Sequence, residues 1–124
     1  MISKYFKPYE TECNCGCGIN NVRQTSIARL DRARGIADMP FIINSACRCP
    51  KHNEDEEGSE TSSHLATEVK ESYAFDIAVG SSHARFAILK ALIEAGFTRI
   101  GIYKTFIHAD DDETKPAEVS WVKG

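Results

Sequence analysis

Short apolar runs, each only a few residues long, alternate along the chain with two amphipathic segments, and this pattern limits the fold most. Runs of this length are typical of strands, whereas a helix needs several turns to bury one apolar face. A chain of 124 residues has room for one hydrophobic core of this kind. We therefore predict a single α+β domain over residues 1–124.

Two segments are predicted to be helices. The first begins at Thr25 or Ser26 and is closed by residues 35–40, as the spacing of its apolar residues and the Gly and Pro indicate. The second follows a cap at Ser81 or Ser82 and ends at a glycine, residue 96. Their predicted apolar faces are Ile27, Leu30 and Ala33 in the first helix, and Phe86, Leu89 and Ile93 in the second.

The apolar runs between and after these helices predict the strands of a mostly antiparallel sheet flanked by helices. The predicted strands are residues 41–43, 74–79, 98–103, 106–109 and 117–122. Residues 10–24 are expected to form a cysteine-rich loop. Residues 50–63 are polar and acidic, so we expect an exposed connection there.

Composition excludes some classes of function. Lys and Arg number 15 against 18 Asp and Glu, a net charge of −3, which argues against a general nucleic-acid binder. No apolar run approaches the roughly 18 residues of a membrane helix, and the first residues lack a stretch of signal-peptide type. We therefore expect a protein made in the cytoplasm, without a membrane span and without a nucleic-acid partner.

The cysteines form two tight groups, Cys13, Cys15 and Cys17 in the first and Cys47 and Cys49 in the second. The alternate spacing of the first group is unlike the C-x-x-C knuckle of common zinc ribbons. Three interpretations stay open. Reduced thiols could pack two loops together, three or four thiolates could hold a second, structural zinc ion, or oxidation could form a disulfide.

Three side chains stand out as candidate metal ligands. Asp76 lies inside the apolar run Ala74–Ala78, where burying a carboxylate is costly unless a cation or hydrogen-bond donors meet it. His64 lies in a loop, and His108 lies in the apolar run at 106–109. Two imidazoles and one carboxylate are a normal zinc set that leaves one position for water, which the metal turns into a nucleophile.

Paired motifs around these ligands resemble a known family. They are Ser62-x-His64, Ala74-x-Asp76 and His108-x-Asp110, in this order. They resemble the zinc D-alanyl-D-alanine carboxypeptidase-like peptidases, which include bacterial cell-wall carboxypeptidases and phage endolysins and share a fold with the hedgehog signalling domain. Residues 41–50 resemble the strand and arginine loop of that family, and residues 96–103 resemble the strand before its last ligand.

The resemblance implies roles for particular residues. His64, Asp76 and His108 would bind one catalytic zinc ion. Arg48 would hold a carboxylate of the substrate and so take part in catalysis, a task that suits the two parallel bonds of a guanidinium. Trp121 would form a wall of the substrate cleft. The implied partner is a stem peptide of peptidoglycan, bound by a monomer that acts on the cell wall if it is a phage or lysis-associated protein.

Two departures from the family pattern leave alternatives open. Asp76 follows His64 by 12 positions, a longer gap than usual, so Glu71 is a rival ligand. We prefer Asp76 because its flanking strand matches the family. The general base is also open, since no carboxylate shortly precedes His108; Asp110 is the nearest candidate and His83 a weaker one.

Two functions follow from these observations. The first is a zinc peptidase that cleaves peptidoglycan stem peptides, either at the terminal D-Ala-D-Ala bond or at an internal bond. The second is a non-catalytic, zinc-containing module of the same fold that only binds peptidoglycan. The longer gap before Asp76 and the missing base favour the second, whereas the paired motifs favour the first.

Overall fold

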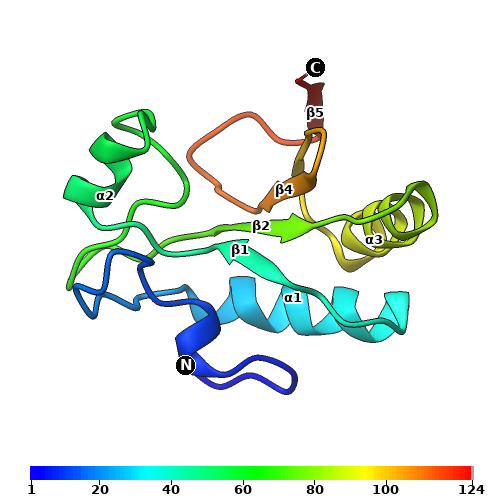
Figure 1. Ribbon diagram of the computed structural model, residues 1–124, viewed down its shortest axis with the longest axis horizontal. Coiled ribbons are helices and arrows are strands. Elements are labelled where there is room, and N and C mark those ends of the chain that lie inside the picture. Colours follow the sequence, from blue (N-terminus) through cyan, green and yellow to red (C-terminus); the bar gives the residue numbers. More distant parts are fainter. Residues whose placement is uncertain (124) are drawn as a thin grey trace.

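The computed structural model describes residues 1–123, and it confirms an α+β fold (Figure 1). Gly124, the last residue of the predicted domain, lies outside the described residues. The elements, in chain order, are the 3-10 helix η1 (Pro8–Glu10), α1 (Gln24–Ala37), β1 (Ile43–Ser45), α2 (Pro50–Asp55), β2 (Ala74–Ala78), α3 (Ser82–Ala95), β3 (Arg99–Ile102), β4 (Phe106–Asp110) and β5 (Val119–Val122). Within residues 1–123, no helix has the length and apolar character needed to cross a membrane.

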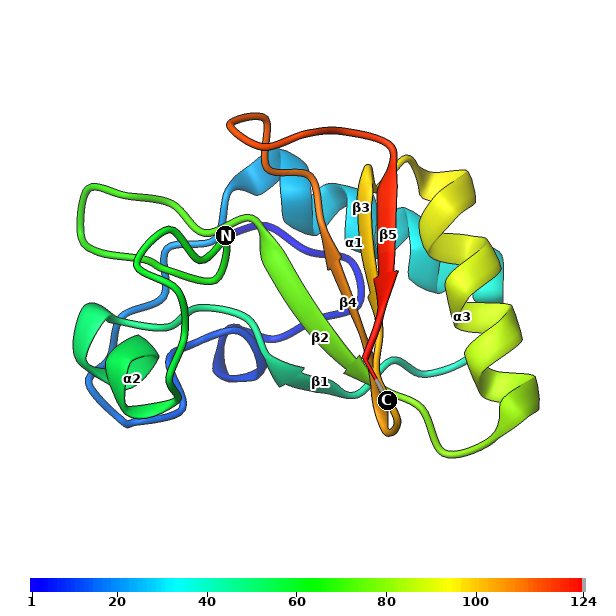
Figure 2. The same cartoon turned by 90° about the horizontal axis from the view of Figure 1, so that it is seen from above.

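The strands form one five-stranded sheet in the order β1-β2-β4-β3-β5 (Figure 2). The pairs β1–β2, β2–β4 and β3–β4 are antiparallel, and β5 joins the edge of β3 in parallel. The prediction of a mostly antiparallel sheet is therefore confirmed. The central pair β2–β4 places Asp76 directly opposite His108.

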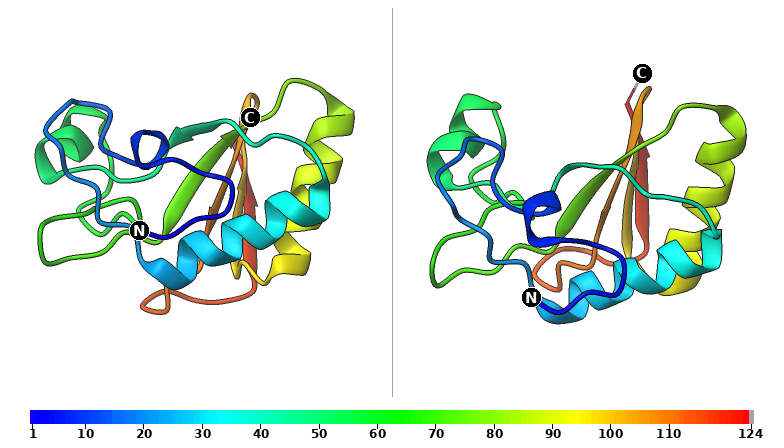
Figure 3. Two further views of the ribbon diagram at one scale, coloured as in Figure 1. Left: turned by 90° about the horizontal axis from the view of Figure 1, so that it is seen from below. Right: turned by 60° about the horizontal axis from the view of Figure 1, so that its bottom comes forward.

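One face of the sheet forms the hydrophobic core. Because successive side chains of a strand point to opposite faces, β2 turns Phe75 and Ile77 to this side and β4 turns Ile107 and Ala109 to it. Helices α1 and α3 pack against each other and enclose this core, as the views from below show (Figure 3). The same alternation sends Asp76 to the opposite face.

Helix α3 begins as predicted but buries a different face. The Ser81 hydroxyl accepts a hydrogen bond from the backbone N–H of Ala84, at 3.1 Å, which confirms the cap. The predicted face is wrong for Phe86 and Ile93, which are 70% and 58% exposed, whereas Leu89 is partly buried against the core. The buried residues are Ile88, Ala91, Leu92 and Ala95. The small alanines let α3 lie close to α1. The face of α3 that carries them is therefore buried, rather than the face that carries the larger apolar residues.

Helix α1 buries the predicted residues and ends within the predicted range 35–40, but it begins earlier than predicted. Ile27, Leu30 and Ala33 are fully buried. The helix begins at Gln24 after Arg23, whose side chain makes no capping bond, rather than at Thr25 or Ser26. It continues through the glycine at 35 to Ala37, and the next residue, Asp38, adopts a left-handed conformation with φ 52°. Asp tolerates this conformation well, so it stops the helix in place of glycine.

Two segments before the site also differ from the prediction. Strand β1 begins at Ile43 rather than at residue 41, and Ile42 is 66% exposed. The predicted connection 50–63 contains the short helix α2. Pro50 occupies its first turn, and the Cys49 thiol accepts a hydrogen bond from the N–H of His52. The sequence does not predict α2 because Cys is an uncommon N-cap residue and the helix lacks an apolar face.

Candidate metal centre

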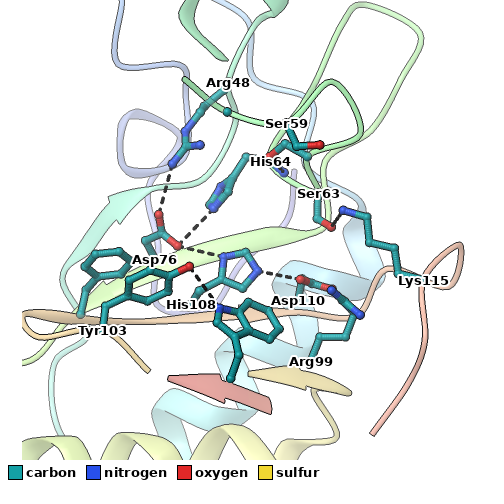
Figure 4. Close-up of a pocket in the computed structure, with 14 residues that line it drawn as sticks. Arg48, Ser59, Ser63, His64, Asp76, Arg99, Tyr103, His108, Asp110 and Lys115 are labelled. Carbon is teal, nitrogen blue, oxygen red and sulfur yellow. Dashed lines mark hydrogen bonds and ion pairs between the residues drawn. The ribbon is translucent and has the colours of Figure 1, made fainter. Parts of the chain in front are cut away.

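A cavity of about 310 Å³ opens on the sheet face opposite the core (Figure 4). Strands β2, β3, β4 and β5 form one side of it, and the segment after α2 forms the other. Its lining residues are Arg48, Gly58, Ser59, Ser62, Ser63, His64, Asp76, Arg99, Tyr103, Phe106, His108, Asp110, Lys115 and Trp121.

Three candidate ligands meet in this cavity. Asp76 Oδ1 lies 3.1 Å from His64 Nε2 and also 3.1 Å from His108 Nδ1. Asp76 comes from β2, His108 from the neighbouring strand β4, and His64 from the loop after α2. One atom of each side chain lies within 4.8 Å of the others, so a single ion can contact all three.

Hydrogen bonds on the far side of each ring fix which nitrogen faces Asp76. His64 Nδ1 donates to the Ala46 carbonyl at 2.7 Å, so its Nε2 points into the cavity as a lone pair. His108 Nε2 donates to Asp110 Oδ2 at 2.6 Å, which leaves Nδ1 for the cavity. Such outer bonds hold metal-binding histidines in one tautomer and orientation.

The electrostatics of the three groups fit a bound cation. Burial lowers the pKa of His64, so its ring is neutral near pH 7 and its Nε2 lone pair faces a carboxylate oxygen. Burial by itself would raise the pKa of Asp76, but the closely packed His108 and His64 rings outweigh it and lower the pKa, which keeps the carboxylate charged. A cation bound between the His64 nitrogen and the Asp76 oxygen would be coordinated by both and would remove the repulsion between their lone pairs. Two imidazoles and a carboxylate are a common ligand set for divalent transition metals, zinc among them.

Asp110 lies behind His108 and is held from several sides. Its Oδ1 accepts the backbone N–H of Asp112 at 3.1 Å and forms an ion pair with Arg99, whose Nε lies 3.2 Å away. Burial would lower the pKa of His108, but the bonds with Asp110 and Asp76 outweigh it and raise the pKa. Asp110 therefore orients His108 and makes its ring more basic.

Arg48 and Trp121, the predicted substrate residues, both line the cavity. The Arg48 guanidinium lies 3.3 Å from Asp76 Oδ2 and 3.2 Å from the Ser45 hydroxyl. The Trp121 ring lies 5.4 Å from the His108 ring and donates its N–H to the Tyr103 hydroxyl at 3.1 Å. Because Tyr103 accepts this bond, its own O–H is left as a donor toward the cavity.

The rival candidates from the sequence lie elsewhere. Glu71 is exposed in the loop between His64 and Asp76 and does not line the cavity, so the structure places Asp76 rather than Glu71 beside the histidines. His83 is exposed in the first turn of α3 and is likewise outside the cavity.

Sequence reasoning missed several contributors to the cavity and its walls, of which Lys115 and Gly101 are the most informative. Lys115 reaches it from the loop before β5 and donates to the Ser63 hydroxyl at 2.9 Å. Gly101 lies between His108 and Trp121 in the sheet register. A Cβ at this position would come within 2.5 Å of the Trp121 ring. A glycine inside an otherwise apolar strand was the one available signal, because it often marks a close approach.

Replacing Gly101 with alanine should displace Trp121 from the cavity wall. The added methyl group would overlap the indole ring, whose Cε2, Nε1 and Cζ2 atoms lie 2.5 to 2.7 Å from its position. Since Trp121 is the only tryptophan, its fluorescence spectrum should shift. Gly80→Ala is the matched control, because a Cβ there meets nothing within 4 Å. An unchanged spectrum in Gly101→Ala would contradict the packing described here.

Comparison with known proteins agrees with this geometry. A family model described as peptidase M15 matches residues 4–110. The chain belongs to the peptidase M15 family. The resemblance to the zinc D-alanyl-D-alanine carboxypeptidase-like peptidases is thereby confirmed. No curated protein gives a significant match. As an M15 peptidase, the chain carries its candidate metal site within the matched residues, and only Lys115 and Trp121 of the cavity lie beyond them.

Proposed function

We propose that this M15 peptidase is a zinc-dependent hydrolase of peptidoglycan stem peptides. The observation that carries the proposal is the convergence of His64 Nε2, Asp76 Oδ1 and His108 Nδ1 on one point of the cavity. A zinc ion bound there would acidify a water molecule and polarise the scissile carbonyl. The three side chains leave a fourth position toward the cavity for that water.

The other lining residues support a peptide substrate with a free carboxylate. Arg48, Arg99 and Lys115 give the cavity a positive lining around the ligands. Arg48 presents a planar guanidinium that can bind a carboxylate through two parallel bonds. Tyr103 offers its O–H to an oxygen of the bound peptide, and Trp121 covers a flank of the cavity. Stem peptides end in such a carboxylate, and the proposal extends to a monomer that acts at the cell wall.

Asp110 is assigned to positioning rather than to proton transfer. Both of its oxygens already accept bonds, and the residue is 1% exposed. It therefore holds the His108 proton at Nε2 while Nδ1 stays free.

Mass spectrometry of purified muropeptides incubated with the protein tests this function. We expect cleavage products that a chelator suppresses and added zinc restores. The mass lost distinguishes removal of the terminal D-Ala from cleavage inside the stem. Products that persist after complete metal removal would contradict a metal-dependent reaction.

A second candidate function is supported by one observation. Of the residues that line the cavity, only Asp76 and Asp110 are carboxylic acids, and both are engaged by the histidines. A peptidase that lacks a free carboxylate base near its metal could instead serve as a binding module. Zinc-loaded protein that binds muropeptides tightly and leaves their masses unchanged after long incubation would establish this alternative and overturn the first.

Replacing Arg48 with lysine should weaken substrate binding more than turnover. Lysine keeps the positive charge but cannot form the paired bonds, so we expect KM to rise about tenfold, the equivalent of roughly 1.4 kcal/mol, while zinc content is unchanged. Steady-state kinetics on a muropeptide measure this. Arg32→Lys on the exposed face of α1 is the control. An unchanged KM would remove Arg48 from substrate binding.

A further inference from the structure

The cysteines form a second candidate metal site, in which the ligand atoms are sulfur rather than nitrogen and oxygen. The sulfur atoms of Cys13, Cys15, Cys17 and Cys49 all lie within 4.8 Å of one another. Cys47, the fifth cysteine, is buried apart from them, with its sulfur 3.2 Å from the Ser72 hydroxyl. The two sequence groups thus divide into four clustered thiols and one packed in the core.

The spacing of the sulfur atoms fits tetrahedral coordination. Cys13 Sγ and Cys15 Sγ lie 3.4 Å apart, and Cys15 Sγ and Cys49 Sγ 3.7 Å. Four thiolates around one zinc ion, each with a bond of about 2.3 Å, stand about 3.8 Å apart. All five cysteines are free thiols, so no disulfide competes for these positions.

Backbone N–H groups point at two of the sulfurs. The N–H of Cys49 lies 3.4 Å from Cys13 Sγ, and the N–H of His52 lies 3.3 Å from Cys49 Sγ. Such donors stabilise the negative charge of thiolates and orient them, as outer-shell partners do in metal sites. Cys49 is therefore both the N-cap of α2 and a cysteine whose sulfur atom is held in one position.

The first loop is shaped to gather alternate cysteines. Gly16 lies between Cys15 and Cys17, and Gly18 follows Cys17. Both glycines adopt a positive φ, 84° for Gly16 and 87° for Gly18. In a straight chain, residues two apart are too distant for their sulfurs to meet around one point. The left-handed glycines bend the chain so that three sulfurs turn inward, a conformation other residues adopt only with strain.

We propose that Cys13, Cys15, Cys17 and Cys49 bind a structural zinc ion as four thiolates. Four protein ligands leave no open position, so this ion serves structure rather than reaction. The loop needs such a support, because Cys15 and Cys17 are exposed and few apolar side chains hold the segment. The ion would fasten the N-terminal loop to the start of α2, which lie side by side (Figure 3).

The proposed ion would also steady the arginine of the cavity, an effect that rests on the proposed function. Arg48 directly precedes Cys49, and its backbone bonds His64 and Ala66 through contacts of 2.8 Å each. The neighbouring Cys47 N–H bonds the Thr11 carbonyl at 3.1 Å. Fastening Cys49 therefore fixes the chain on the side of Arg48 that faces the N-terminal loop.

Metal analysis of full-length variants tests the cysteine site without using activity. His108→Ala removes a ligand of the other centre, and we expect this variant to keep one zinc ion per chain. Adding Cys15→Ser should remove that ion, whereas adding Cys47→Ser as the matched control should leave it. Cys15 is exposed, so its replacement by serine removes no core contact. A His108→Ala protein without zinc would overturn the proposal, and so would zinc retained after Cys15→Ser.

Cobalt gives an independent readout of the ligands. The His108→Ala protein loaded with cobalt should show the near-ultraviolet absorption of thiolate–cobalt charge transfer, and its thiols should resist a thiol reagent. Both effects should disappear with Cys15→Ser and persist with Cys47→Ser. Cobalt bound without thiolate absorption would overturn the assignment. Because this measurement uses a protein that lacks the other centre, its outcome is separate from any failure to cleave peptidoglycan.

Discussion

The His108→Ala protein should show no detectable cleavage of muropeptides and should lose the ion bound with His64 and Asp76. Alanine removes one of only three ligands and leaves the Asp76 carboxylate and the His64 lone pair facing each other at 3.1 Å. Without its metal, the water loses the acidity that makes it a nucleophile near neutral pH. Mass spectrometry of the products and elemental analysis of the protein measure the two losses.

A histidine outside the cavity provides the comparison for this variant. His83→Ala, at the exposed first turn of α3, should keep both cleavage and metal content. Circular dichroism should show the same secondary structure in both variants, since His108 lies on the sheet face opposite the core. Cleavage retained by His108→Ala would exclude the proposed centre.

The Asp110→Asn protein should bind zinc and cleave peptide about 10- to 100-fold more weakly, although its shape is almost unchanged. The Oδ1 side of Asp110 faces two donors, the N–H of Asp112 and Arg99. The amide oxygen of asparagine must accept from them, so its NH₂ group turns to His108 Nε2. His108 then accepts at Nε2 and carries its proton on Nδ1, where the metal should bind.

Zinc titration separates this effect from a general loss of stability. Excess zinc should restore part of the activity of Asp110→Asn, because the metal can still displace the Nδ1 proton at a cost. Asp55→Asn is the control, since Asp55 is exposed and paired only with Lys51 on the surface of α2. Equal zinc affinity in Asp110→Asn and the unchanged protein would show that Asp110 does not orient His108.

The sequence allowed the fold class and the close grouping of the candidate ligands to be predicted because both depend on local patterns. A carboxylate inside an apolar run has few explanations, and alternation along β2 and β4 places Asp76 and His108 on one face. The buried face of α3 could not be predicted, because it depends on the contact with α1 rather than on the size of Phe86 or Ile93.

Other features of the site depend on contacts between distant segments. Arg99 meets Asp110 only through the pairing of β3 with β4, and Lys115 reaches Ser63 from a loop with no recognisable pattern. The close approach of Trp121 to Gly101 arises because β5 returns in parallel beside β3. Pairing of this kind joins residues far apart in the chain, and local sequence carries little information about it.

The long gap between His64 and Asp76 has a consequence for how such chains are recognised. The N–H of Tyr73 bonds the Ser63 carbonyl at 2.9 Å, which closes the intervening loop at its base. Val69, near its tip, is 93% exposed. The number of residues between the two candidate ligands can therefore change without changing the distance between their side chains. A search pattern with a fixed number of residues at this point would pass over proteins whose centres are the same, whereas one with a variable gap would retrieve them.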